Sequence, residues 1–411
     1  MTNRTLGSYH VDLVDQSIDQ YVSIAGESLL SDDPKVWETY IQRIGRENIR
    51  GVFTGNELVG GLAFYRVGQW FGGREIATAG VSGVGIHPAH RGSGACGLLM
   101  RQTLQELHDE GIPLSSLYAS TQRLYRQCGY AQAGTQTKYS LPLSDLAASG
   151  LPLQRELPIF RFPSKSQTPP LSALRYADQI RAKKSNGLFQ RTDGLFHRLL
   201  HPFDGRGSIT YLLGDESKPD GYVILKPGVR EHGIPQPLVA TDVVANSPRS
   251  LGRLAALLYD HRSMQQDFQW FGSPVDPLVL YSTRSIVNVR EQLRWLLRIV
   301  HLPGAIAARG YPASVSGQLH LAIEDPLIDA NAGAWVVDID NGNASVEPGG
   351  VGCLQLKIDW LAALFSGYLT PTQLIDIGEL TTSKTGRDVE QQLELFTAAF
   401  SGPPPWLPEL F

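Results

Sequence analysis

The chain has 411 residues, of which 42% are hydrophobic and 18% charged, and this length predicts two or three domains of ordinary size. A net charge of −4 and a pI near 6.2 give no general basic field, which disfavours nucleic-acid binding. The three cysteines, Cys96, Cys128 and Cys353, lie far apart, so we expect neither a disulfide framework nor a metal site. Without a long apolar run or an N-terminal secretion signal, a soluble cytoplasmic protein is expected.

The first part of the chain predicts mixed helices and strands. We expect helices over residues 15–30 and 34–44, two strands joined at Gly55-Asn56, and another strand over residues 79–86. A helix beginning near Cys96, a strand over residues 114–120 and a short helix over residues 122–130 follow.

The stretch HRGSGACGLLM, residues 90–100, opens an apolar helix with an arginine and three glycines. Backbone N–H groups at a helix start lack internal partners and face the positive end of the helix dipole, so residues 92–97 can hold a pyrophosphate. Arg91 adds further donors. On this segment alone, the alternative that the glycines merely start a helix stays open. The turn follows a late strand, which argues against a dinucleotide fold.

A similar order of elements returns after a Leu-, Pro- and Ser-rich boundary near residue 146. Strands are expected over residues 209–215, 220–227 and 238–245, followed by a helix over residues 250–261, and this repetition indicates an internal duplication. Leu254 stands where the first copy has Cys96, and its bulk should obstruct a bound phosphate.

The last part of the chain has a different pattern. A hairpin turning at Asn341-Gly342 and a strand passing into an apolar helix over residues 354–370 are expected. The final segment, SGPPPWLPELF, contains three consecutive prolines, which favour a stiff extended arm.

Three stretches carry a family resemblance. VSGVGIHPAHRGSGACGLLM resembles the acetyl-CoA signature of the GNAT N-acetyltransferases, with Arg91, Gly94 and Cys96 at the motif positions, although glycine or alanine is usual where Cys96 stands. SLYASTQRLYRQCGYAQAG and LRWLLRIVHLPGAIAARGY are similar to segments of the Eis (enhanced intracellular survival) acetyltransferases, and the final phenylalanine also matches. The resemblance covers nearly the whole chain.

This resemblance implies an α+β (mixed α/β) fold of tandem GNAT domains followed by a sterol-carrier-protein-like domain. Residues 1–145 would form the catalytic GNAT domain that binds acetyl-CoA, and residues 146–295 a degenerate GNAT-like domain. Residues 296–411 would form the sterol-carrier-protein-like domain, with a tail that returns to the active site. The family also implies a homo-hexamer.

The resemblance further implies a cofactor site, in which backbone groups of residues 84–86 pair with the pantetheine arm and polarise the thioester carbonyl. The residues expected to bind acetyl-CoA are Val84, Gly85, Ile86, Arg91, Gly92, Ser93, Gly94, Ala95, Cys96, Gly97, Ser120 and Tyr125.

Two catalytic residues are expected from the same family. Tyr130 would be the general acid that protonates the departing thiolate, and the carboxylate of Phe411 would be the general base. The alternative for Tyr130 is that its ring simply packs in the core. The alternative for Phe411 is that the chain terminus is disordered, as termini commonly are. Trp406, Leu407 and Leu410 give the tail enough apolar surface to dock.

We hypothesise that the acceptor amine binds in an acidic cleft, whose negative charge attracts polyamines. It would be lined by Glu27, Asp32, Asp33 and Glu409, with Trp37 stacking on a sugar or a cation. Asp32 and Asp33 precede Pro34 and are equally good helix-capping residues.

The function implied is transfer of acetyl from acetyl-CoA to primary amines, at more than one position of an aminoglycoside or a similar polyamine. Transfer would be direct, because Cys96 has no evident base partner for a covalent route. The alternatives are acetylation of protein lysines or peptide N-termini, and a non-catalytic CoA- or lipid-binding protein.

Overall fold

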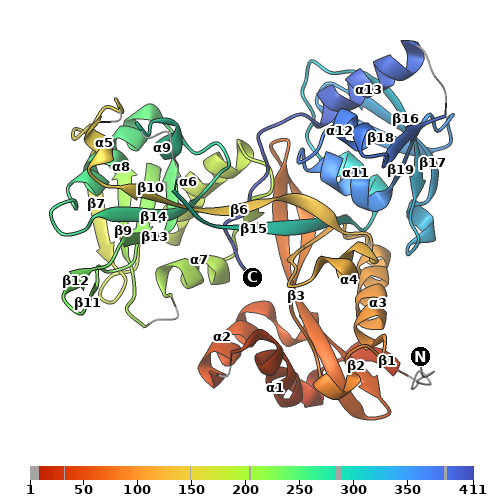
Figure 1. Cartoon of the computed structure of the whole chain (residues 1–411), viewed down its shortest axis with the longest axis horizontal. Coiled ribbons are helices and arrows are strands. Elements are labelled where there is room, and N and C mark those ends of the chain that lie inside the picture. The colour runs from red at the N-terminus through yellow and green to blue at the C-terminus, as the bar shows by residue number, and fades with distance from the viewer. Residues whose placement is uncertain (1–8, 32, 149, 203–204, 284–287, 384–386) are drawn as a thin grey trace. The chain divides into compact units, whose positions relative to one another are not determined.

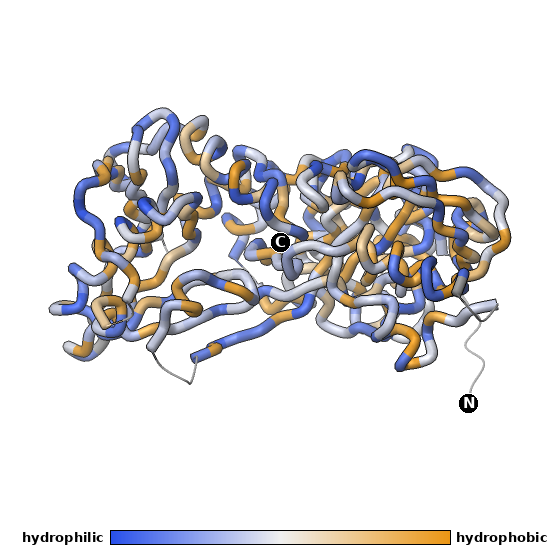
Figure 2. Tube along the Cα trace, turned by 90° about the horizontal axis from the view of Figure 1, so that it is seen from above, coloured by the Kyte–Doolittle hydropathy of each residue, from blue (hydrophilic) through white to orange (hydrophobic). Residues whose placement is uncertain are grey.

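The computed structural model describes residues 9–31, 33–148, 150–202, 205–283, 288–383 and 387–411 (Figure 1). Apolar and polar residues alternate closely along the trace of its strands and helices (Figure 2), as expected for elements with one face in a core. No helix in these ranges combines the length and the apolar character that crossing a bilayer requires.

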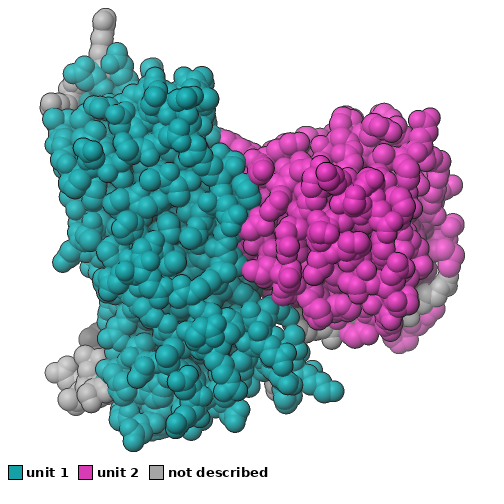
Figure 3. Space-filling model, turned by 180° about the vertical axis from the view of Figure 1, so that it is seen from behind, with its two compact units in different colours: residues 1–133, 295–401, 411 teal, residues 134–294, 402–410 magenta. Residues whose placement is uncertain are grey.

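The chain forms two compact units, coloured separately in Figure 3. Unit 1 comprises residues 1–133, 295–401 and 411, and unit 2 comprises residues 134–294 and 402–410. The three predicted domain ranges therefore do not coincide with the two compact units, and their boundaries stay a prediction.

Unit 1 contains a sheet with the strand order β1-β2-β3-β4-β5-β15. These strands are β1 (Tyr9–Leu13), β2 (Ile49–Thr54), β3 (Glu57–Phe71), β4 (Arg74–Ile86), β5 (Leu114–Tyr118) and β15 (Asn288–Ile299). The helices beside it are α1 (Ile18–Leu29), α2 (Pro34–Ile44), α3 (Ala95–Asp109) and α4 (Gln122–Arg126). The predicted helices and the two-residue turn at Gly55-Asn56 are confirmed within one or a few residues.

Helices α1 and α3, both labelled in Figure 1, cover opposite faces of the unit 1 sheet. Side chains alternate along a strand, so neighbouring residues of β3 point to different faces. Gly61 approaches the ring of Tyr21 on α1, while Leu62 packs in the core that contains Leu99 and Leu104 of α3.

A second sheet of unit 1 has the order β18-β17-β16-β19-β20. Its strands are β16 (Gly317–Glu324), β17 (Gly333–Asp340), β18 (Asn343–Pro348), β19 (Leu354–Lys357) and β20 (Leu380–Thr382). Its helices are α10 (Leu302–Ala308), α11 (Ile358–Phe365), α12 (Pro371–Asp376) and α13 (Arg387–Phe400). The predicted hairpin turn at Asn341-Gly342 joins β17 to β18, and both residues have positive φ, 45° and 79°, as a tight hairpin turn of this kind requires.

Unit 2 is built on strands in the order β6-β14-β13-β10-β9-β7. They are β6 (Ala131–Pro142), β7 (Ile159–Pro163), β9 (Ile209–Gly214), β10 (Pro219–Leu225), β13 (Leu238–Ala245) and β14 (Asp267–Gly272). Short strands are β8 (Phe189–Gln190), β11 (Arg230–Glu231) and β12 (Ile234–Pro235), and the helices are α5 (Asp145–Ala148), α6 (Leu171–Lys183), α7 (Asp193–Leu200), α8 (Pro248–Tyr259) and α9 (Pro277–Leu280).

Strands β6 and β15 pair outside the sequence domains from which they come. In unit 1, Trp295 to Ile299 of β15 pair antiparallel with β5, although this segment lies at the end of the second repeat. In unit 2, Thr137 to Pro142 of β6 pair antiparallel with β14, although this segment belongs to the first repeat. Each repeat therefore receives a strand from the other part of the sequence.

Candidate active site

The predicted cofactor strand, β4, separates from its neighbour β5 halfway along. The two strands pair in parallel only from Thr78–Leu114 to Val81–Leu117. Beyond Val81, β4 continues to Ile86 while its ladder with β5 has ended. The backbone edge of residues 82–86 that faces away from β3 is thus outside the strand ladder, as a ligand lying along this edge requires.

An irregularity in β4 marks the same point. Gly61 of β3 pairs with Gly85, but Ala63 pairs with Ser82, so β4 carries one extra residue and bulges. Gly83 has a φ of +62°, which favours glycine. The bulge re-aims the backbone groups of Val84, which is half-buried, and of the buried Gly85 and Ile86 that follow.

The glycine turn leads into α3, which starts at Ala95. Gly92 and Gly94 have φ of +76° and +91°, and a side chain at Gly92 would meet no atom within 4 Å. At Gly97 the nearest atom would be Arg101 Nη1 at 3.6 Å. The first turn of this fifteen-residue helix is therefore open to an approaching anion.

Two more predicted cofactor residues, Arg91 and Ser93, lie in this turn, and a third, Ser120, follows β5. Arg91 is exposed, and its Nε donates to the carbonyl of Ile86 at 3.1 Å, which ties the guanidinium to the end of β4. The hydroxyl of Ser93 donates to the carbonyl of His90 at 2.7 Å. Ser120 is exposed just after β5.

The thiol of Cys96 is half-buried at the start of α3. Burial, with a smaller contribution from Cys128, raises the pKa of this thiol to about 11. The thiol is therefore protonated at neutral pH, and the direct rather than covalent route stays a prediction.

Tyr130 is fully buried, and its hydroxyl lies 2.7 Å from Ser115 Oγ on β5. Since the Ser115 hydroxyl donates its one proton to the carbonyl of Ala79 at 3.0 Å, Tyr130 is the donor in this pair. Burial raises the pKa of the Tyr130 phenol above its ordinary value, so the group holds its proton at neutral pH. Tyr125, also predicted near the cofactor, contacts the Tyr130 ring edge to face.

Phe411 is half-buried among aromatic residues of the unit 1 strands. Its ring meets Tyr65 of β3 at a centroid distance of 6.3 Å and Tyr118 of β5 at 5.8 Å. These rings continue to Tyr40, whose hydroxyl lies 2.5 Å from Ser82 Oγ in the bulge of β4. The last residue thus lies among residues of the sheet that carries the predicted cofactor strand.

The tail before Phe411 is anchored within unit 2. The backbone carbonyl of Thr135 on β6 accepts a hydrogen bond from Leu407 N–H at 3.1 Å, and the N–H of Thr135 donates to the carbonyl of Pro405 at 3.3 Å. The carboxylate of Glu409 is buried and accepts from Arg191 Nε at 2.5 Å. The sequence predicted that Glu409 lines an open acidic cleft. The structure instead buries its carboxylate in unit 2, where Arg191 balances the charge.

The other predicted acceptor residues differ in exposure. Glu27, near the end of α1, is exposed. Asp33 caps α2 and accepts from Lys35 N–H at 2.9 Å, so it takes the helix-capping role that is the alternative to substrate binding. Trp37 is 5% exposed, and its ring packs against Tyr21 and Tyr40, so it presents no open face for stacking. Asp32 lies outside the described residues.

The residues that sequence reasoning missed are Ser115, Tyr65 and Tyr118. Ser115 and Tyr118 both lie in LSSLY, which the sequence predicts as part of a strand without indicating a partner for either side chain. Their roles depend on Tyr130 and Phe411, which reach them through the fold.

Comparison with known families agrees with this arrangement. Models described as "Acetyltransferase (GNAT) domain" match residues 12–133 and 187–299, and one described as "Sterol carrier protein domain" matches residues 302–408. A crystal structure of a GCN5-related N-acetyltransferase from Anabaena variabilis is 33% identical, covers 98% of this chain and 100% of that one, and has a TM-score of 0.89.

Eis proteins are among the relatives. The N-acetyltransferase Eis of Mycobacterium tuberculosis is 26% identical over 394 residues, which are 90% of each chain. Eis1 of Mycobacterium abscessus, at 20% identity, shares the fold with a TM-score of 0.79 over 98% of this chain and 100% of that one. The chain is thus an N-acetyltransferase of the GCN5-related (GNAT) family and belongs to its Eis group, with two GNAT domains followed by a sterol-carrier-protein-like domain.

Proposed function

We propose that this enzyme transfers acetyl groups from acetyl-CoA to primary amines, at more than one position of an aminoglycoside or a similar polyamine. The observation that carries the proposal is the position of Phe411, whose ring packs on Tyr65 and Tyr118 of the first GNAT domain. A terminal carboxylate held at this point has a use in a reaction that must remove a proton from an amine.

The residues around β4 and α3 fit acetyl-CoA. The free edge of residues 82–86 suits an extended pantetheine arm, and the open glycine turn with the exposed Arg91 suits its phosphates. Acetyl-CoA, when bound, supplies the acetyl group and the thiolate that leaves. Backbone N–H groups of Val84 to Ile86 would polarise the carbonyl under attack.

The carboxylate of Phe411 takes the role of general base. An ammonium group has no lone pair, so it must first lose a proton before the nitrogen can attack, and the carboxylate accepts this proton directly or through one water. The nitrogen loses a second proton after the C–N bond has formed, and this proton balances the one that Tyr130 gives to the sulfur. An ordinary terminal carboxylate, with a pKa of about 3.5, is a weak base, so its contribution depends on its placement. The aromatic rings around Phe411 support that placement.

Tyr130 takes the role of general acid. As the C–S bond breaks, the sulfur needs a proton, and the buried phenol retains one at neutral pH. In the present arrangement the Tyr130 hydroxyl donates to Ser115, so it must turn from Ser115 to the sulfur during the reaction. Ser115 is then a positioning residue, which holds the phenol ready until the sulfur arrives.

Of the predicted acidic residues that the structure describes, the exposed Glu27 remains the candidate to attract a polyamine, since Asp33 caps a helix and Glu409 is paired with Arg191. Trp37 would have to be uncovered before it could stack on a ligand.

Mass spectrometry of an aminoglycoside with several amines, incubated with enzyme and acetyl-CoA, tests the proposal. We expect products that carry two or more acetyl groups, and a lower rate on a peptide that contains one lysine. A faster reaction on the lysine peptide, with no acetylated aminoglycoside, would redirect the proposal to protein acceptors.

A further inference from the structure

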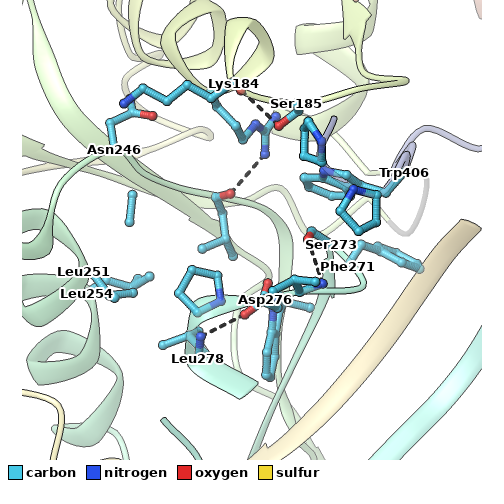
Figure 4. Close-up of a pocket in the computed structure, with 18 residues that line it drawn as sticks. Lys184, Ser185, Asn246, Leu251, Leu254, Phe271, Ser273, Asp276, Leu278 and Trp406 are labelled. Carbon is cyan, nitrogen blue, oxygen red and sulfur yellow. Dashed lines mark hydrogen bonds between the residues drawn. The ribbon is translucent and has the colours of Figure 1, made fainter. Parts of the chain in front are cut away.

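The second GNAT domain contains a cavity where the first has its predicted cofactor groove. In unit 2 the parallel strands β13 and β14 pair only at Leu238–Phe268 and Val239–Gln269 and then separate. A cavity of about 410 Å³ lies beyond this point, between Val243 of β13 and Trp270 of β14. Figure 4 shows Leu251 and Leu254 on one side of it and Phe271 and Trp406 on the other.

The end of this cavity that would hold phosphates is closed. A side chain on Gly252 would collide with the carbonyl oxygen of Pro152, and Gln154 N–H donates to the carbonyl of Gly252 at 3.1 Å. Ser247 and Ser250 form a capping box at the start of α8, which uses the N–H of Ser250. This helix start therefore offers no open anion cradle like the one at Gly92, and the cavity does not fit a nucleotide cofactor.

The walls are mainly apolar. Leu251 and Leu254 project from α8, and Trp270 from β14 is almost fully buried. Pro403 and Trp406 of the tail complete the wall. A volume of this size lies within the range of small-molecule sites, and apolar walls of this kind select a hydrocarbon or aromatic body.

One cationic side chain that lines the cavity forms no ion pair among the described residues. Lys184 is exposed and has no ion-pair partner among the described residues, and Figure 4 shows its side chain extending toward Asn246. The guanidinium of Arg181, by contrast, is already paired with Asp178 and Asp242.

The buried carboxylate of Asp276 already accepts hydrogen bonds within the protein. It accepts from Trp270 Nε1 at 3.0 Å and from Leu278 N–H at 2.9 Å as the cap of α9.

We propose that this cavity binds a small amphiphilic carboxylate, with its apolar body between Leu251, Leu254 and Trp270 and its carboxylate on Lys184. The second GNAT domain has then kept the space for an apolar chain between its splayed strands while losing the site for phosphates. The ligand is an alkyl or aromatic acid rather than a CoA ester.

Calorimetric titration of the full chain with octanoate tests this site, with octylamine and octanol as probes of the same length. We expect octanoate to bind best of the three. Equal or tighter binding of octylamine would overturn the assignment of an anionic head group.

Two pairs of variants locate the site. Leu251→Trp fills the cavity and should weaken octanoate binding at least about tenfold, whereas Leu257→Trp alters a half-buried leucine of the same helix that does not line the cavity and should not change it. Lys184→Met should weaken octanoate binding but not octanol binding, with Lys183→Met as the exposed control. Should Leu251→Trp fail to fold, Ala245→Met narrows the same space from β13. Unchanged octanoate binding in the folded cavity variants would place the ligand elsewhere and end the proposal.

A consequence for catalysis rests on the proposed function. Because Pro403 and Trp406 form part of the wall, a bound ligand contacts the arm that ends at Phe411. Octanoate should therefore change the acetylation rate of the wild type but not of Leu251→Trp. Binding without a change in rate would leave the site standing and remove only this coupling, whereas loss of the proposed activity altogether would leave the calorimetric result unaffected.

Discussion

At the scale of single residues, Tyr130 and Ser115 form the pair on which the proposed acid catalysis depends. Replacing Tyr130 with phenylalanine removes the proton donor and leaves the ring, so the core should survive. We expect kcat to fall about 10²- to 10⁴-fold, the usual contribution of a general acid, while the affinity for CoA changes little. Steady-state kinetics together with calorimetric CoA binding would measure both.

Tyr311→Phe provides the matched control for this substitution. Tyr311 is buried in unit 1 and its hydroxyl donates to the carbonyl of Ile306 at 2.9 Å, so the control loses one phenolic hydrogen bond away from the predicted site. A Tyr130→Phe enzyme as active as the control would exclude the acid role.

A second residue-scale feature is the buried ion pair below the turn that carries Tyr130. Arg298 is fully buried, its Nη2 lies 2.5 Å from Asp325 Oδ2, and Gly129 packs against its guanidinium. Among the described residues its Nε and Nη1 have no hydrogen-bond partner, so Asp325 is the main compensation for this charge.

Asp325→Ala should therefore lower the free energy of unfolding by about 3 to 5 kcal/mol, because it leaves a buried cation unpaired. Denaturant unfolding followed by circular dichroism measures this loss. Asp340→Ala, at an exposed position of β17, should change stability by no more than about 0.5 kcal/mol. Equal stabilities of the two variants would show that the Arg298 charge is compensated in another way.

Residue roles were predictable only where a local pattern carries them. The capping role of Asp33 and the accessible backbone of the glycine turn before α3 depend on neighbouring residues in the sequence, so both could be predicted. The burial of Glu409 could not, because its partner Arg191 lies 218 positions away in the sequence. The aromatic neighbours of Phe411 are similarly set by the fold.

At the scale of elements, the tail is held at several points before it reaches Phe411. Two backbone hydrogen bonds with Thr135 and the Glu409–Arg191 pair fix residues 405–409. Two glycines added after Phe411 would therefore move the carboxylate without releasing the arm. We expect kcat to fall about 10²- to 10⁴-fold, as for loss of a general base.

Two comparisons sharpen this test of the carboxylate. The same two glycines placed before Met1 should leave the rate unchanged. Phe411→Ala keeps the carboxylate but loses the contacts with Tyr65 and Tyr118, so its rate should fall less than that of the extended chain. Full activity in the extended chain would remove the base role of the terminus.

Helices and hairpins were the most predictable elements. Apolar periodicity and the residues at their ends defined α2 and α3, and the two-residue turns defined the β2–β3 and β17–β18 hairpins. Strands β6, β14 and β15 were not predicted. The pairing of a strand depends on which distant segment offers a matching edge, and that choice leaves little local trace.

At the scale of the whole molecule, the exchange of β6 and β15 makes the proposed boundary at residue 145 a poor place to divide the chain. A fragment of residues 1–145 would lack the strand that pairs with β5, and it would carry β6 without β14. We expect this fragment to aggregate through its open edges.

Size-exclusion chromatography and circular dichroism of the fragment would measure this, with co-expression of residues 146–411 as the restoring control. A monodisperse, folded fragment of residues 1–145 would mean that β15 is dispensable for the first sheet.

The pairing of Trp295 with Tyr118 also bears on the order of events during translation. Strand β5 leaves the ribosome well before its neighbour is made, because residues 119–294 are synthesised in between. At 5–20 residues per second, this interval is roughly 10 to 35 s. The nascent chain must keep an unfinished sheet edge protected throughout that time, so we expect ribosome-associated chaperones to bind it until β15 has been made.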